Sequence, residues 1–171
     1  MKGMPRSMSR GNPSQSPITR IRIPVQARQF NMTDPGAAVG WGTFPAGGLP
    51  EGNVIILGVM AYLKFTSVSG GLTATFTPTV ALGTAATADN ALTGAEVNLA
   101  AATALSAAVG GATPVGRVAN TATESGLTVD NTDRTLNVNV NVTVPDAAIS
   151  AAAVMQADGF VDVVCIVLGD D

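Results

Sequence analysis

Residues 135–144, TLNVNVNVTV, are the clearest structural signal in this chain of 171 residues. Leu136 and four valines occupy every second position, and asparagines or a threonine fill most of the positions between them. Alternation with a period of two, rich in β-branched side chains, predicts a strand with its valine face buried. Pro145 ends the strand, because proline has no N–H to give to the sheet ladder.

The second face of this strand carries Asn137, Asn139 and Asn141 and no charge. Exposed strands usually carry charged side chains, which oppose pairing with another chain. An uncharged, amide-rich face is instead a candidate for a hydrated subunit interface. We therefore take these three asparagines as candidate subunit-contact residues.

Other segments extend the same pattern outward. Strands are predicted at residues 53–65 (with a bulge allowed by Gly58), 72–77 and 159–168, and shorter ones at 18–25, 96–99, 114–118 and 127–129. The glycine-rich stretches 36–42 and 47–48 are predicted to be turns. Two Ala-rich stretches, 100–108 and 147–157, are candidates for short helices: the first reads equally as loop, and Asp146 is a suitable N-cap for the second. Short strands separated by turns predict an all-β fold, an antiparallel β-sandwich or jelly-roll-like body.

Charge divides the chain into two parts. Residues 1–33 hold six of the nine basic residues and no acid, whereas residues 34–171 hold three basic residues against all twelve acids, a net charge of −9. The first part is rich in Pro, Ser and Gly and buries too little apolar surface to offset its ordering entropy. We predict a basic extended arm at 1–33 and a β body at 34–171. The arm's basic residues, expected to contact an acidic protein surface, are Lys2, Arg6, Arg10, Arg20, Arg22 and Arg28.

The composition also bears on partners. The acidic body repels phosphate, and the arm has no aromatic residues among its basic ones up to residue 28, so no nucleic-acid partner is predicted.

The longest near-apolar stretch, 54–63, is shorter than the roughly 20 residues of a membrane-spanning helix. No signal-peptide pattern is present, so synthesis in a cytoplasm is expected. With seven aromatic residues, the core is built from small side chains, which favours burial of further surface in an oligomer.

Few residues offer chemistry. The chain has no histidine, which removes Ser-His and Cys-His nucleophiles and imidazole metal ligands. Cys165 lies in an apolar strand and is expected to be a buried, inert thiol. Residues 130–133, DNTD, lack the full calcium-loop pattern and favour an Asx turn. Glu96 and Asp162 interrupt apolar sequence and are candidate buried acids, with Arg117 or Arg134 as expected partners. No catalytic residue, metal site or cofactor is predicted.

Four segments of the chain resemble a family of tailed-bacteriophage structural proteins, the head decoration or capsid cement proteins. The segments are residues 49–66 (LPEGNVIILGVMAYLKFT), 81–99, 127–142 and 161–171. The resemblance implies a β-sandwich or jelly-roll subunit without enzymatic activity. Such a subunit is usually a homotrimer bound to the major capsid protein on the outside of the virion head.

Two alternatives remain at this point. One is another virion component, such as a head-fibre base or a tail part. The other is a carbohydrate- or surface-binding β-sandwich module, which would need exposed aromatic residues such as Trp41 and Tyr62.

Overall fold

The computed structural model describes residues 18–119 and 127–169. This part of the chain is all-β, with nine strands and two short 3₁₀ helices, and the predicted fold class is confirmed. The strands are β1 (Ile18–Thr33), β2 (Gly40–Gly48), β3 (Gly52–Ser67), β4 (Thr79–Gly83), β5 (Ala100–Ala104), β6 (Gly116–Ala119), β7 (Leu127–Asn131), β8 (Asn137–Val144) and β9 (Ala153–Gly169). The 3₁₀ helices are η1 (Gly94–Glu96) and η2 (Asp146–Ala148).

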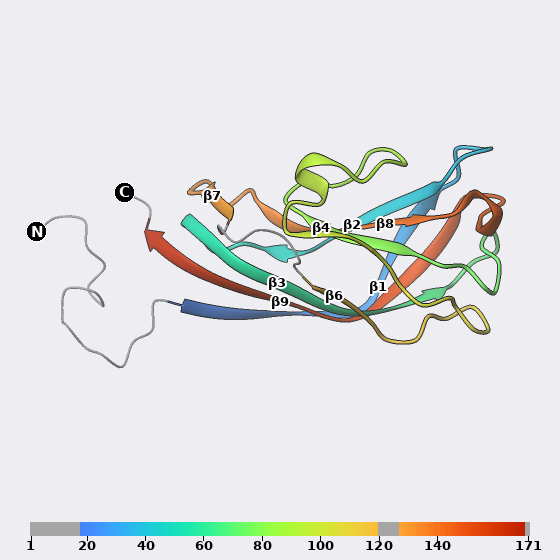
Figure 1. The fold of residues 1–171 in the computed structure, drawn as a ribbon, viewed down its shortest axis with the longest axis horizontal. Helices are drawn as coiled ribbons and strands as arrows, with labels where there is room; N and C mark the ends of the chain where they lie inside the picture. Colours follow the sequence, from blue (N-terminus) through green and yellow to red (C-terminus); the bar gives the residue numbers. More distant parts are fainter. Residues whose placement is uncertain (1–17, 120–126, 170–171) are drawn as a thin grey trace, which may run out of the picture.

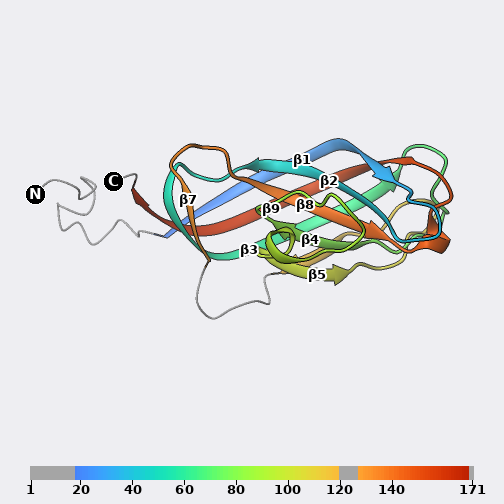
Figure 2. The same cartoon turned by 90° about the horizontal axis from the view of Figure 1, so that it is seen from above.

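All strand pairings are antiparallel, and the strands belong to one sheet with the order β5-β4-β8-β2-β1-β9-β3-β6, while β7 pairs with β3. The sheet curls into two layers. β3 and β9 run together in one layer with β1 beside them, and β2, β4 and β8 form the facing layer (Figure 1). Seen from above, the long strands follow the long axis of the molecule, and β5 lies at one edge (Figure 2).

The core lies between these layers. Val138, Val140, Val142 and Val144 of β8 are at most 1% exposed, so the predicted valine face is confirmed. Aromatic rings from three strands join the layers: Phe30 of β1 contacts Phe44 of β2, with 5.0 Å between ring centroids, and Phe65 of β3, with 6.1 Å. The three rings are buried and supply large apolar surfaces to a core of mostly small side chains.

The Ala-rich helices were predicted wrongly. Residues 100–108 begin with β5, and residues 147–157 contain the end of η2 followed by the start of β9. Pairing decides the second case, because β9 has partners on both sides, β1 and β3, and its Met155 is fully buried. Residues 72–77 were predicted to be a strand. They form no strand, and only an isolated β-bridge joins Leu72 to Ile149.

β2 occupies glycine-rich sequence that the turn prediction covered. Glycine has a packing role here: a Cβ on Gly42 would lie 2.5 Å from the carbonyl oxygen of Asn31 in β1. The small residues therefore allow β1 and β2 to approach closely where they pair, at Met32↔Gly42 and Thr33↔Trp41.

Half of the predicted arm belongs to the sheet. β1 pairs with β9 from Ile18↔Ile166 to Met32↔Ala153. Its inward positions include Val25 and Phe30, which are buried in the core, so residues 18–33 have apolar surface that an arm would leave in water. The remainder of the predicted arm, with Lys2, Arg6 and Arg10, lies outside the described residues.

Candidate interaction surface

The outward side of β1, β9 and β3, called the outer face below, carries an ion cluster. Asp162 of β9 points away from the core, because its neighbours Val161 and Val163 point into it. Nε and Nη2 of Arg22 donate to the two oxygens of Asp162, both at 2.8 Å, and Arg20 donates to Oδ2. The Asp162 side chain is 3% exposed, whereas the two arginine side chains are 57% and 54% exposed. The arginines therefore cover the acid and remain hydrated themselves.

The arginines also set the charge state of the acid. Hydrogen bonds from Arg22, and then the hydrogen bond from Arg20 and the charges of both arginines, lower the pKa of Asp162 to about 2, against the opposing effect of burial. The expectation that a buried acid pairs with arginine is confirmed for Asp162, but with different partners. Arg134 pairs with Glu51 instead, and the side chain of Arg117 lies outside the described part. Glu96 is half-buried and accepts a hydrogen bond from the N–H of Thr93.

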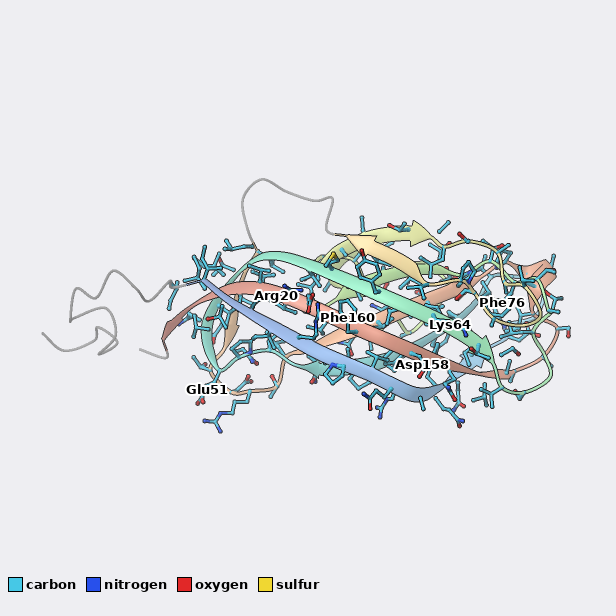
Figure 3. All side chains as sticks on the ribbon, turned by 90° about the horizontal axis from the view of Figure 1, so that it is seen from below. Arg20, Glu51, Lys64, Phe76, Asp158 and Phe160 are labelled. Carbon is cyan, nitrogen blue, oxygen red and sulfur yellow. The ribbon has the colours of Figure 1, made fainter. Side chains whose placement is uncertain are left out.

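Aromatic side chains extend this cluster across the outer face. The guanidinium of Arg22 lies over the ring of Phe160, 4.0 Å from its centroid, and the Tyr62 ring packs against Phe160 with 5.3 Å between centroids. Arg20, Phe160 and Lys64 are labelled along these strands in Figure 3. The cluster therefore joins β1, β9 and β3 by side-chain contacts as well as by the sheet ladder.

One end of the outer-face strands is apolar and exposed. Ile18 at the start of β1, Leu57 in the β3 bulge and Leu168 near the end of β9 are 49%, 43% and 49% exposed. Ile166 pairs with both Ile18 and Ile55 at this end. An exposed group of large apolar residues on a soluble protein often marks a contact with another macromolecule.

The amide face of β8 is covered by the chain itself. The Asn141 amide donates to the carbonyls of Ala85 and Glu96, and its oxygen accepts from the N–H of Thr87 and the hydroxyl of Thr43, with distances of 2.7–2.9 Å. Asn141 is fully buried as a result.

The other two predicted contact residues follow the same trend. Asn139 is 8% exposed and donates to the Thr84 carbonyl at 3.1 Å, and Asn137 is half-buried. Asn139 and Asn141 are thus bound by the loop between β4 and β5 of the same chain, which corrects the expectation that this face is free for another subunit. The local sequence around these asparagines does not predict this packing, because the loop residues that bind them lie 40 or more positions earlier in the chain.

Two further segments singled out in the sequence, residues 130–133 and Cys165, have structural roles. Asp130 accepts hydrogen bonds from the N–H and hydroxyl of Thr132, which lower the pKa of Asp130, so residues 130–133 form the expected Asx turn. Cys165 is fully buried, and burial raises the pKa of its thiol. Within residues 18–119 and 127–169, no group of three or more His, Cys, Asp or Glu residues could hold a metal ion. No helix in the same ranges is long and apolar enough to cross a membrane.

Comparison with protein-family models and with curated proteins gives no match. Among solved structures, the chain is similar to the structure of infectious bursal disease virus Gt strain, with 13% identity and a TM-score of 0.36. It is also similar to the infectious bursal disease virus VP2 subviral particle, with 12% identity and a TM-score of 0.35. Each match covers 86% of this chain and 32% of the other, so the chain spans about a third of their length. These likenesses are remote, and the function proposed below rests on the chain's own residues.

Proposed function

We propose that this chain is a non-enzymatic virion structural protein that binds the outside of a tailed-phage capsid and stabilises it. The outer face carries the proposal, because it combines exposed apolar residues with half-exposed arginines on a sheet that is already stable in its own pairing. Such a surface suits contact with a second protein better than contact with water. The resemblance of four sequence segments to decoration and cement proteins supports the same role, with the major capsid protein as partner and a homotrimer as the assembled form.

Binding to particles tests the proposal directly. Purified protein would be mixed with undecorated capsids of the phage that encodes it and sedimented. Leu57→Lys places a charge in the apolar end of the outer face, and we expect it to weaken binding about tenfold, which corresponds to about 1.4 kcal/mol. Val109→Lys is the matched control, because Val109 is 81% exposed and its segment bridges to Thr66, at the opposite end of β3 from Leu57. Equal binding of wild type and Leu57→Lys would show that the outer face does not contact the capsid.

Stabilisation is a separate measurement. Decorated capsids should melt at a higher temperature than undecorated ones, because a ligand that binds only the assembled lattice stabilises it by mass action. Full occupancy without any change in melting temperature would reduce the protein to a passive coat.

The basic residues that precede β1 are proposed as an additional anchor. Lys2, Arg6 and Arg10 have no acid near them in sequence, whereas Arg20 and Arg22 are already engaged by Asp162. Deletion of residues 2–17 leaves β1 intact and removes three positive charges. The truncated protein should bind capsids more weakly, and with a smaller salt dependence, because exposed ion pairs are screened by salt. An unchanged salt dependence would exclude this role.

One observation favours the carbohydrate-binding alternative. Tyr62 and Phe160 form an aromatic pair on the outer face. However, Arg22 already covers one face of the Phe160 ring, and Trp41 is half-buried where β2 pairs with β1 and β8. A glycan-array signal abolished by Tyr62→Ala would favour this second function.

A further inference from the structure

A pocket of about 270 Å³ lies between β1 and β2. The two strands pair only at Met32↔Gly42 and Thr33↔Trp41, and the rest of β1 has no ladder with β2. The apolar lining of the pocket consists of Pro24, Val25, Phe44, Pro45 and Ala46. Gln26 and Arg28 complete the lining and supply its polar side chains.

Irregularities in both strands accompany this pocket. The register of β1 against β9 shifts between Val25 and Arg28, and the register of β2 against β8 shifts between Pro45 and Gly47. In the β1 bulge, Ala27 adopts a φ of 48° and donates its N–H to Oδ1 of Asp158 at 2.7 Å. Bulges often redirect side chains at functional positions in sheets, and this one is fixed by a side-chain hydrogen bond.

Asp158 does not neutralise the pocket's cation. One of its oxygens accepts from Ala27, and the other accepts from the Gln156 amide at 2.8 Å. Arg28 is exposed and forms no ion pair with any acid of the described residues. The pocket therefore places an available guanidinium beside the side chains of Pro24, Pro45 and Ala46, and a guanidinium binds carboxylates through two parallel hydrogen bonds.

The pocket edges favour a compact ligand over a peptide strand. Pro24 on β1 and Pro45 on β2 have no N–H, so neither position can donate a hydrogen bond to a peptide strand added in the gap between β1 and β2. The volume is just below the roughly 300–1,000 Å³ of pockets that take drug-sized ligands. A single ring or a short acyl chain fits such a space.

We propose that this pocket binds a small organic monocarboxylate, with its apolar part against Pro24, Pro45 and Ala46 and its carboxylate on Arg28. The site is independent of the capsid contact proposed above, because it lies between β1 and β2 and not at the apolar end of the outer face. Ligand binding and capsid binding can therefore fail separately.

Sodium phenylacetate is a suitable probe, in a titration of the full-length ¹⁵N-labelled protein followed by NMR. We expect saturable shifts of amide signals around residues 25–28 and 44–46, with a dissociation constant in the millimolar range, on the order expected for so small a ligand. Arg28→Gln should weaken binding about tenfold or more, because it removes a charge-assisted pair. Arg134→Gln makes the same charge change in the turn before β8 and should leave binding unchanged.

Further probes and variants separate the alternatives. Phenylacetamide has the same shape without the charge, and should bind at least about tenfold more weakly than phenylacetate. Arg28→Lys keeps the charge and should restore part of the affinity lost in Arg28→Gln. The proposal is overturned if phenylacetate gives no saturable shifts, if the amide binds equally well, or if Arg28→Gln binds as wild type does. Binding of an acetylated Leu-Asp peptide, with no binding of phenylacetate, would also overturn it.

Discussion

Arg22 and Asp162 face each other across the β1–β9 ladder, and two 2.8 Å hydrogen bonds join the guanidinium to both carboxylate oxygens. The geometry explains how an acid can be almost fully buried on the outward side of a sheet. Arg22 remains half-exposed, so the pair is desolvated mainly on the side of the acid. Loss of the charge on Asp162 would thus leave two arginines without their shared partner.

Acid should destabilise the chain through this pair. The pKa of Asp162 is lowered from 3.8 to about 2, so its contribution to stability is complete above about pH 5 and is lost as the pH falls toward 2. The difference amounts to about 2 kcal/mol. Urea unfolding at pH 6, 4, 3 and 2 should show the stability advantage of wild type over Asp162→Asn shrinking by about this amount. Asp146→Asn is the control, because Asp146 in η2 is exposed, and an advantage that is independent of pH would contradict the assignment.

The β8 asparagines should differ in their tolerance of substitution by aspartate. Asn141→Asp removes two donors and places a carboxylate against the carbonyls of Ala85 and Glu96, so we expect a loss of about 3 kcal/mol or more. Asn139→Asp removes longer bonds, of 3.1 Å to the Thr84 carbonyl and 3.4 Å to the Asn137 carbonyl, and should cost about 1–2 kcal/mol. Half-buried Asn137 serves as the control. Urea unfolding of the three variants measures the order, and equal losses would contradict it.

Native mass spectrometry adds a second reading of the same variants. Because the loop of the same chain binds Asn139 and Asn141, their substitution should lower stability without changing the oligomeric state of the folded fraction. If the Asn139→Asp oligomer dissociates while the stability of the subunit to urea is unchanged, Asn139 lies in a subunit interface after all.

The valine face of β8 predicts a third result. Val140 is fully buried between the layers, and Val140→Ala should cost about 2 kcal/mol through lost apolar burial and a residual cavity. Val140→Asp places an unpaired charge in the core and should prevent soluble expression. Val115→Ala is the matched control, since Val115 is 67% exposed and its truncation should change stability by less than about 0.5 kcal/mol. Equal effects of the two alanine substitutions would contradict the proposed orientation of β8.

Local pattern was sufficient for the strands that have strong alternation or long apolar runs. β8, β3 and the part of β9 from residue 159 onward lie where the sequence predicts strands, because valine-rich segments have few alternatives to a sheet interior. The bulge allowed by Gly58 is also present, as a register shift between Ile56 and Gly58. These features depend on side chains within one segment.

Features that depend on distant partners were not accessible from local pattern. Residues 18–25 were predicted to be a strand, but β1 continues to Thr33 because β9 supplies a ladder for it on both sides of the bulge between Val25 and Arg28. Alanines at 153 and 157 favour a helix in isolation, yet they pack in the core within β9. The Arg20–Asp162–Arg22 cluster joins residues about 140 positions apart, so only the expectation of an arginine partner, and not its identity, followed from the sequence.

A fourth prediction concerns two glycines of the outer-face strands. Gly159 of β9 pairs opposite Leu63 of β3 and Val25 of β1, at a φ of 141°, and a Cβ there would lie 1.9 Å from the carbonyl oxygen of Tyr62. Gly159→Ala must therefore strain the backbone and push β3 away from β9, and we expect a loss of about 3 kcal/mol or more in urea unfolding. Gly58 is the matched control, because a Cβ at this bulge position meets nothing within 4 Å. Gly58→Ala should be neutral or slightly stabilising, since alanine has less conformational freedom to lose on folding. Losses within about 0.5 kcal/mol of each other would show that the close approach of β3 and β9 at Gly159 does not hold in solution.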